Sequence, residues 1–146
     1  MSADSKLGHA IVTGQPGDPA YLHHIRCRRH AFLADEPAAV GGGDAGPAPF
    51  DYLVSALGAC TAITLRMSGE RKGWDLGEIR VELQAHKDAQ GNAGIDRQVT
   101  VGGALNAEQR DRLADVCERT PVTLVVKSGL PVRTQLGSTA AKKDSA

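Results

Sequence analysis

The clearest chemical potential of this chain lies in one thiol, Cys60, within the run LGAC. Two further cysteines, Cys27 and Cys117, lie too far along the chain for metal-site spacing, and three cysteines do not suggest a disulfide framework. A cysteine acts as a nucleophile only as the thiolate, so its reactivity depends on a nearby group that stabilises negative charge. The sequence therefore predicts thiol chemistry at Cys60, provided that the fold supplies such a group.

The segment around Cys60 is predicted to form one long helix, from Gly46 to Gly73. Gly46, Pro47 and Pro49 are typical of its start, and Gly73 is placed to cap its C-terminus. A stripe of apolar and small residues recurs at helical spacing and is expected to face the core: Leu53, Ala56, Leu57, Cys60, Ile63, Thr64 and Met67. Because a helix dipole acts only near the helix ends, it gives a mid-helix thiol no help. The activating charge is expected from another part of the chain.

Segments on both sides of this helix carry the alternating and β-branched patterns of antiparallel strands. The predicted strands are 9–13, 21–27 and 30–34 before the helix, and 79–86 and 95–101 after it, with a turn at 90–94. A second helix is predicted to begin at Asn106, which forms a capping-box pattern with Gln109, and to end before Thr120-Pro121. One or two final strands are expected at 122–126 and 131–136. This order indicates an α+β domain with an antiparallel sheet.

Composition limits the class of protein. A length of 146 residues fits one domain, expected at 1–136, followed by a disordered polar tail at 137–146. Lys plus Arg number 17 and Asp plus Glu also 17, so no basic surface predicts nucleic-acid binding. No apolar run is long enough for a membrane span, and the polar start lacks the apolar core of a signal peptide. We expect a cytoplasmic protein that needs no metal or other cofactor.

The predicted long helix carries more apolar surface than a chain of this size can cover. Its apolar residues, including Ile63, Leu65 and Met67, need covering on more than one side, while only one small sheet and one other helix are available for packing. An obligate homodimer that buries the helix between two subunits would cover the surplus. We therefore expect two copies of the chain to associate.

Several segments together resemble the OsmC/Ohr family of small peroxide-handling proteins, over about residues 21–136. They are RHAFLADEP, GGGDAGPAPFDYLVSALGACTAITLRM, RKGW, IDRQVTV and RTPV, of which LGACTAITLRM followed by RKGW is the most specific. The resemblance implies an OsmC-like fold, in which antiparallel sheets pack around a long central helix that carries Cys60, in an intertwined homodimer. It also implies that a reactive cysteine reduces organic hydroperoxides at two active sites near the dimer interface.

The resemblance assigns roles to individual residues. It places Cys60 on the family's peroxidatic cysteine, and Arg29 near the activating arginine, with Arg28 as the alternative. Asp51 matches the family's acidic residue, although the hydroperoxide-resistance pattern puts that position on Phe50. Asp51 lies nine residues before Cys60, about 13 Å along the axis and on the opposite face, so it could share a site only from the other subunit. A first-turn acid favoured by the helix dipole is the other interpretation of Asp51.

The family's second, resolving cysteine belongs to a Cys-Pro pair, which in this chain is Thr120-Pro121. Cys117 lies roughly one helical turn earlier and is the candidate to replace it, with a buried structural thiol as the alternative. A chain without a resolving thiol would follow a one-cysteine cycle, in which an external thiol reduces the oxidised sulfur.

Two functions remain open at this point. The first is a thiol-dependent peroxidase that reduces organic hydroperoxides in oxidative-stress defence, with Cys60 as the nucleophile and an external thiol or dithiol as the reductant. The resemblance implies a dithiol such as dihydrolipoamide. The alternative is a non-catalytic small-molecule-binding or stress-associated protein on the same scaffold. The lost Cys-Pro pair favours the second function, whereas the retained LGAC and RRH motifs favour the first.

Overall fold

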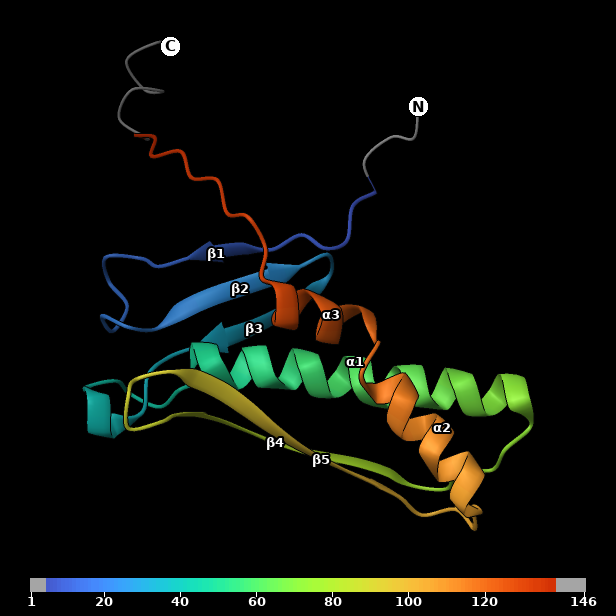
Figure 1. The fold of residues 1–146 in the computed structure, drawn as a ribbon. Coiled ribbons are helices and arrows are strands. Elements are labelled where there is room, and N and C mark those ends of the chain that lie inside the picture. Colours follow the sequence, from blue (N-terminus) through green and yellow to red (C-terminus); the bar gives the residue numbers. More distant parts are fainter. Residues whose placement is uncertain (1–4, 139–146) are drawn as a thin grey trace.

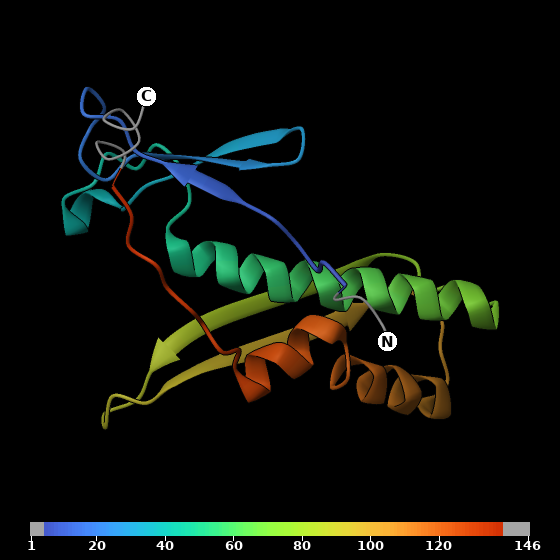
Figure 2. The ribbon, with the colours of Figure 1, turned by 90° about the horizontal axis from the view of Figure 1, so that it is seen from above.

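The structure, a computed structural model, describes residues 5–138 and has the predicted α+β architecture. One antiparallel sheet lies on each side of a long helix, α1, and two shorter helices lie beside it (Figures 1 and 2). The elements in chain order are β1 (Ile11–Thr13), β2 (His23–Cys27), β3 (His30–Ala34), η1 (Ala38–Val40), α1 (Pro49–Lys72), β4 (Ile79–Lys87), β5 (Ala93–Val101), α2 (Ala107–Cys117) and α3 (Pro121–Ser128). Within the described residues, no helix is both long and apolar enough to cross a bilayer.

The N-terminal sheet has the strand order β1-β2-β3, with both pairs antiparallel. β3 has the predicted bounds, and β1 and β2 begin two residues later than predicted. A two-residue turn, Arg28–Arg29, joins β2 to β3, and Arg28 takes a left-handed backbone with φ 55°. The hairpin extends to one side of α1 when the molecule is seen from above (Figure 2). The main packing partners of α1 are instead β4, α3 and α2.

α1 is a helix of 24 residues whose ends follow from local chemistry. Pro49 is its first residue, where the missing N–H costs nothing, and the Asp51 carboxylate accepts the Ala48 N–H at 2.9 Å. Gly73 ends the helix with φ 69°, a left-handed conformation that favours glycine. Cys60 lies near the middle of the helix.

The side of α1 that faces the core differs from the predicted one. The residues buried on α1 are Leu57, Gly58, Thr61, Leu65, Ser68 and Gly69. A Cβ added at Gly58 would lie 2.7 Å from Leu83 Cδ1, so the glycine lets β4 approach closely. Leu53, Ile63 and Met67 are 42–55% exposed, and Cys60 is only half-buried. The prediction that this stripe faces the core is confirmed for Leu57 but wrong for Leu53, Ile63 and Met67, because the sheet packs on the side of the helix that carries Gly58, Thr61 and Leu65.

The C-terminal sheet is a single long hairpin. β4 and β5 pair from Ile79 with Val101 to Lys87 with Ala93, close to the predicted bounds. The core lies between this sheet, α1 and α2, and its buried members are Leu65, Leu76, Leu113 and Cys117. At the tip of the hairpin, backbone and side-chain donors of Asn92 lower the pKa of Asp88, which also accepts the Gln90 N–H. These bonds fix the turn between the two strands.

The two C-terminal helices show how capping residues decide local structure. The predicted capping box of α2 is confirmed, since Asn106 and Gln109 exchange side-chain and backbone hydrogen bonds. The segment predicted as a strand at 122–126 belongs to α3, so that prediction is wrong. Thr120 caps α3 and Pro121 is its first residue. A short apolar run cannot distinguish a strand from a helix by periodicity alone, and here the Thr-Pro start selects the helix.

The chain beyond α3 has no regular structure where it is described. The strand predicted at 131–136 is wrong, because no described strand pairs with this segment. Of the tail expected at 137–146, residues 139–146 lie outside the described residues.

The loop before α1 is organised around a buried carboxylate, Asp35. Its oxygens accept the Glu36 N–H at 2.8 Å and the Ala45 N–H at 3.1 Å, so one side chain holds both ends of the loop. The hydroxyl of Tyr52 donates to the Leu33 carbonyl, which ties the first turns of α1 to β3. The Ala45 and Glu36 N–H donors lower the pKa of Asp35 below its ordinary value. Asp35 therefore fixes where α1 begins.

The lowered pKa gives a testable dependence of stability on pH. The ionised Asp35 carboxylate stabilises the fold above about pH 4, the range of an unfolded aspartate, and loses this effect as the pH falls through the lower folded pKa. Asp35→Asn should lower the melting temperature at neutral pH, and the difference from wild type should shrink at about pH 3. Asp44→Asn in the same loop, at an exposed position, is the control and should change little at either pH. A penalty for Asp35→Asn that is equal at both pH values would contradict this role.

Candidate functional site

The sulfur of Cys60 lies at the N-terminus of α3. Cys60 Sγ accepts a hydrogen bond from the Val122 N–H, with 3.5 Å between nitrogen and sulfur, and lies 4.0 Å from Thr64 Oγ1. Pro121 has no N–H, so the Val122 N–H is the first free donor of α3. A backbone donor at the positive end of a helix dipole stabilises a thiolate more than a thiol. Cys60 Sγ thus faces the start of a second helix, which the sequence did not predict.

Thr120, the residue at the expected resolving position, has a structural role in this arrangement. It is fully buried, and its hydroxyl accepts the Thr123 N–H at 3.4 Å as the N-cap of α3. Its Oγ1 also lies 2.6 Å from Thr123 Oγ1, in a second hydrogen bond. Thr120 therefore fixes the α3 terminus that faces Cys60.

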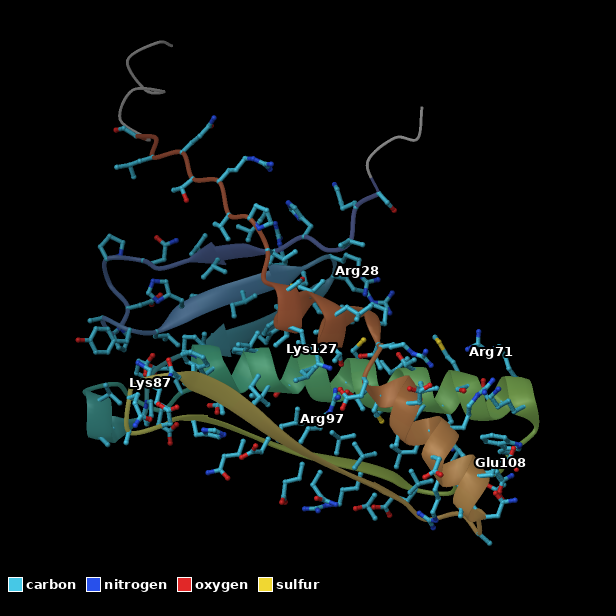
Figure 3. All side chains as sticks on the ribbon, viewed as in Figure 1. Arg28, Arg71, Lys87, Arg97, Glu108 and Lys127 are labelled. Carbon is cyan, nitrogen blue, oxygen red and sulfur yellow. The ribbon has the colours of Figure 1, made fainter. Side chains whose placement is uncertain are left out.

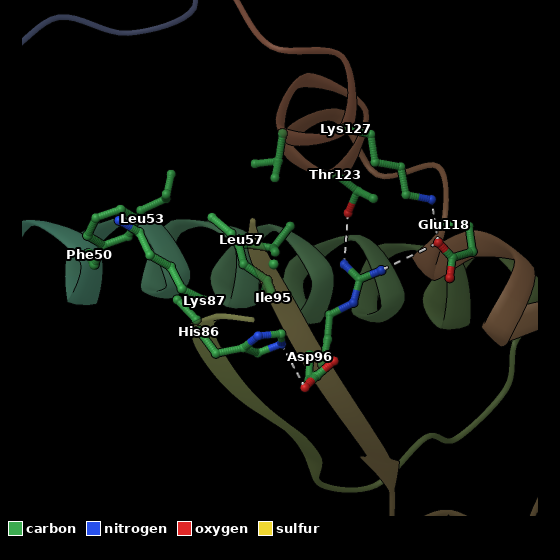
Figure 4. A pocket seen from close by; sticks show the side chains of 15 residues that line it. Phe50, Leu53, Leu57, His86, Lys87, Ile95, Asp96, Glu118, Thr123 and Lys127 are labelled. Atoms are coloured by element: carbon green, nitrogen blue, oxygen red, sulfur yellow. Dashed lines mark hydrogen bonds and ion pairs between the residues drawn. The ribbon is translucent and has the colours of Figure 1, made fainter. Parts of the chain in front are cut away.

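A partly buried cation, Arg97 on β5, lies behind the same junction and was not identified from the sequence. Its side chain is 12% exposed. Nη1 donates to Thr61 at 2.9 Å and to Thr123 at 2.8 Å, and Nη2 donates to the Cys117 carbonyl at 2.9 Å. Figure 3 labels Arg97 between the hairpin and the helices, and Figure 4 marks its bonds to Thr123 and Glu118. Arg97 lies on the same face of β5 as Val99 and Val101. The alternation of the strand could therefore have indicated from the sequence that Arg97 faces inward.

The other two predicted site residues are not brought to Cys60 within the described protomer. Arg29 belongs to the β2–β3 turn, and no hydrogen bond or ion pair of Arg28 or Arg29 occurs among the residues described. Asp51 is exposed and accepts the Ala48 N–H at the start of α1. In a single copy of the chain, Asp51 therefore acts as a helix-start carboxylate.

The two remaining cysteines lie in different surroundings. Cys117 is 7% exposed and packs in the core with Leu65, Leu76 and Leu113. Burial raises the pKa of the Cys117 thiol, and the nearby charge of Arg97 opposes this rise only in part. Cys27 is half-buried at the end of β2. All three cysteines are free thiols.

A cavity of about 790 Å³ is lined by residues of α1, the β4–β5 hairpin and α3 (Figure 4). Its apolar wall consists of Phe50, Leu53, Leu57, Ile95 and Val126. Its lining also carries His86, whose Nε2 lies 3.0 Å from Asp96 Oδ2, and an ion pair between Lys127 and Glu118 at 2.6 Å. The lining reaches Leu57 and Thr123, which are close in sequence to Cys60 and Val122, but it does not include the thiol. The cavity has the volume and character of a site for a small, largely apolar molecule.

In geometric terms, the chain is a small α+β protein whose long helix presents a half-buried thiol to the N-terminus of another helix. Residues 41–135 match the family model described as OsmC-like protein. This match covers more than half of the sequence, so the chain belongs to the OsmC-like family. No curated protein matches the sequence significantly.

Solved structures with the same fold cover most of the chain. A Psychrobacter arcticus protein, described as a candidate osmotic stress induced and detoxification response protein, has a TM-score of 0.70 at 16% identity, over 88% of this chain and 92% of that chain. The OsmC-like protein of Mycoplasma pneumoniae has a TM-score of 0.70 at 14% identity, over 85% and 89%. The organic hydroperoxide resistance protein OsmC of Legionella pneumophila has a TM-score of 0.63 at 15% identity, over 84% and 92%. At these identities the likeness shows the fold.

Proposed function

We propose that the protein is a thiol-dependent peroxidase that reduces organic hydroperoxides, with Cys60 as the peroxidatic nucleophile. The observation that carries the proposal is the Val122 N–H that donates to Cys60 Sγ. A half-buried thiol that accepts a donor at a helix N-terminus has surroundings typical of a reactive cysteine, whereas a thiol in apolar surroundings is typically inert. Membership of the OsmC-like family and the solved hydroperoxide resistance protein with the same fold support this choice.

The reaction follows from the position of the sulfur. The Cys60 thiolate attacks one oxygen of the hydroperoxide, so that an S–O bond forms and the O–O bond breaks. The alkoxide leaves as the alcohol after it takes a proton, and the sulfur becomes a sulfenic acid. In this step the thiol is oxidised by two electrons and the peroxide is reduced.

The return to the thiol requires a reductant from outside the chain. Thr120 has a hydroxyl at the resolving position, and the buried Cys117 belongs to the core. An external thiol therefore attacks the sulfenic acid and releases water, and a second thiol group breaks the mixed disulfide. A dithiol supplies both groups in one molecule. We assign this one-cysteine cycle to the cytoplasm, where reduced thiols are abundant.

A homodimer is part of the same proposal. The exposed stripe on α1, with Leu53, Ile63 and Met67, gives a second copy an apolar surface to cover. Arg29 and Asp51 contact no Cys60 in one protomer, so any role in catalysis requires a second copy to bring them to the thiol. In that arrangement, an arginine would stabilise the thiolate together with the Val122 N–H.

The alternative, a non-catalytic binding protein, also has an observation in its favour. The 790 Å³ cavity can hold a small molecule without any reaction, and the chain lacks a thiol at Thr120. A tight ligand of the cavity, together with no peroxide consumption by the wild-type protein, would favour this function.

The reactive thiol can be located directly. After one equivalent of cumene hydroperoxide and a sulfenic-acid trap, we expect Cys60 to be labelled first, because it alone has the Val122 donor. Cys117 should stay unlabelled, since it is buried and its raised pKa keeps it protonated. With excess peroxide and no reductant, oxidation should continue to the sulfinic acid. The measurement is mass spectrometry of peptides digested without reductant.

Two outcomes would contradict the assignment. First labelling at Cys27 would remove Cys60 from its role as the nucleophile. A Cys60–Cys117 linked peptide as the main product would replace the one-cysteine cycle by a two-cysteine cycle.

A further inference from the structure

Two contacts of the Arg97 guanidinium coincide with the Cys60 junction. Thr61 immediately follows Cys60 on α1, and Thr123 immediately follows Val122 on α3. Arg97 Nη1 donates to both threonine hydroxyls, at 2.9 Å and 2.8 Å. One nitrogen atom thus links the residues next to the sulfur and next to its N–H donor.

The same guanidinium also reaches the helix before α3. Its Nη2 donates to the carbonyl of Cys117, the last residue of α2, at 2.9 Å, and lies 3.9 Å from Glu118 Oε2. A cation near the carbonyl end of a helix is favourable because it opposes the helix dipole. Glu118 also binds Lys127, which lowers the pKa of that carboxylate, so an ionised Glu118 faces Arg97. Arg97 therefore joins β5 to α1, α2 and α3.

The threonine hydroxyls around Arg97 are fully used. Thr61 donates to the Leu57 carbonyl at 2.7 Å while it accepts from Arg97. Thr123 accepts from Arg97 and shares a second bond with Thr120 at 2.6 Å. Among the described residues, every buried side-chain nitrogen and oxygen has a partner. Arg97 thus makes its hydrogen bonds to the protein itself, although its side chain also lines the cavity.

We propose that Arg97 is a positioning residue that holds the Val122 N–H of α3 against Cys60 Sγ, through Thr61 on one side and Thr123 on the other. This inference rests on the proposed role of Cys60 as the reactive thiol. Planar geometry is essential to it, because three acceptors on three helices need the fixed directions of a guanidinium. Thr120 belongs to the same hydrogen-bond network, since its hydroxyl bonds to Thr123 and caps α3. The residue at the resolving position thus supports the thiolate instead of reducing the oxidised sulfur.

The test measures alkylation of Cys60 by iodoacetamide, quantified by mass spectrometry of its peptide, at about pH 7 and about pH 10. The ratio of the two rates reports how well the protein stabilises the thiolate, because access to the sulfur affects both rates equally. Arg97→Lys keeps the positive charge but loses the planar guanidinium and its fixed donor directions. Thr123→Val removes the hydroxyl on α3 that accepts the hydrogen bond from Arg97. In both variants the ratio should fall about tenfold, the effect of one hydrogen bond to a charged group.

Matched controls separate positioning from general damage. Thr100→Val lies on the exposed face of β5, and Arg80→Lys alters an exposed arginine of β4, so both should keep the wild-type ratio. Melting temperatures are measured in parallel. If Arg97→Lys and Thr123→Val lower the melting temperature but keep the wild-type ratio, Arg97 is only structural and the proposal is overturned. A wild-type ratio in Arg97→Lys, with a lowered ratio in Arg97→Met, would show that only the charge matters and would also overturn it.

The experiment is independent of peroxide turnover. A wild-type protein that consumes no peroxide would contradict the proposed function, while the alkylation ratios would still decide the role of Arg97. A Thr61→Val variant provides a third measurement at the α1 end of the link, and it should lower the ratio as Thr123→Val does.

Discussion

Replacing Cys60 by serine is expected to abolish peroxide consumption. A serine hydroxyl is a far weaker nucleophile than a thiolate and forms no sulfenic acid, so the rate with cumene hydroperoxide and a dithiol should fall by about a thousandfold or to the background reaction. Serine is close to cysteine in size and retains an acceptor for the Val122 N–H, so the junction of α1 and α3 should persist. The assay follows loss of hydroperoxide over time.

The matched control is Cys117→Ser, which changes the buried thiol of the core. It should lower stability, because a hydroxyl replaces an apolar thiol at a 7% exposed position, but it should retain most of the turnover. Cys27→Ser should have little effect on either quantity. If Cys60→Ser keeps turnover and Cys117→Ser loses it, the nucleophile has been assigned to the wrong cysteine.

The second large effect is expected at the exposed stripe of α1. Ile63 is 54% exposed in one copy of the chain and should become buried between two copies. Ile63→Asp would place two unpaired carboxylates in that interface, at a cost of about 3 kcal/mol or more each. The dissociation constant of the dimer should rise by more than about a hundredfold. Sedimentation at micromolar concentration should show a dimer for wild type and a monomer for the variant.

Thr100→Asp introduces the same charge on the exposed face of β5 and should leave the dimer intact. If Arg29 and Asp51 act from a second copy, Ile63→Asp should also slow peroxide consumption, whereas Thr100→Asp should not. A wild-type protein that sediments as a folded monomer would refute the dimer proposal.

The sequence predicted those parts of the fold that local signals specify. The β4–β5 hairpin follows from strict alternation, and the start of α2 follows from the capping pattern of Asn106 with Gln109. The prediction of a strand at 122–126 was wrong because this apolar run has no distinctive period. The signal that identifies a helix there is Thr120-Pro121 at its start. The prediction of which side of α1 faces the core was partly wrong for another reason. The helix is apolar on several sides, so only the packing of Leu83 against Gly58 shows which side the sheet covers.

The sequence identifies Cys60 as the candidate thiol but not the groups that surround it. The LGAC run indicates Cys60, yet the Val122 donor depends on α3, which was expected to be a strand. A backbone N–H carries no sequence signature of its own, so it becomes visible only when the helix is placed. Arg97 had a signal in its strand parity, but its partners come from three helices far apart in the chain. Long-range convergence of this kind is a property of the tertiary structure.

The close contact at Gly58 lies two residues before Cys60 on α1. The Leu83 side chain of β4 occupies the space that a Cβ at position 58 would fill, so the glycine allows α1 to lie close to the sheet at this position. A shift of the helix by one residue would bring the side chain of Leu57 or Ala59 into that space. Cys60 follows Gly58 by two residues on the same helix. The contact between Gly58 and β4 therefore lies close to the position where Cys60 meets α3. The missing side chain at position 58 thus brings the helix that carries Cys60 close to the C-terminal sheet.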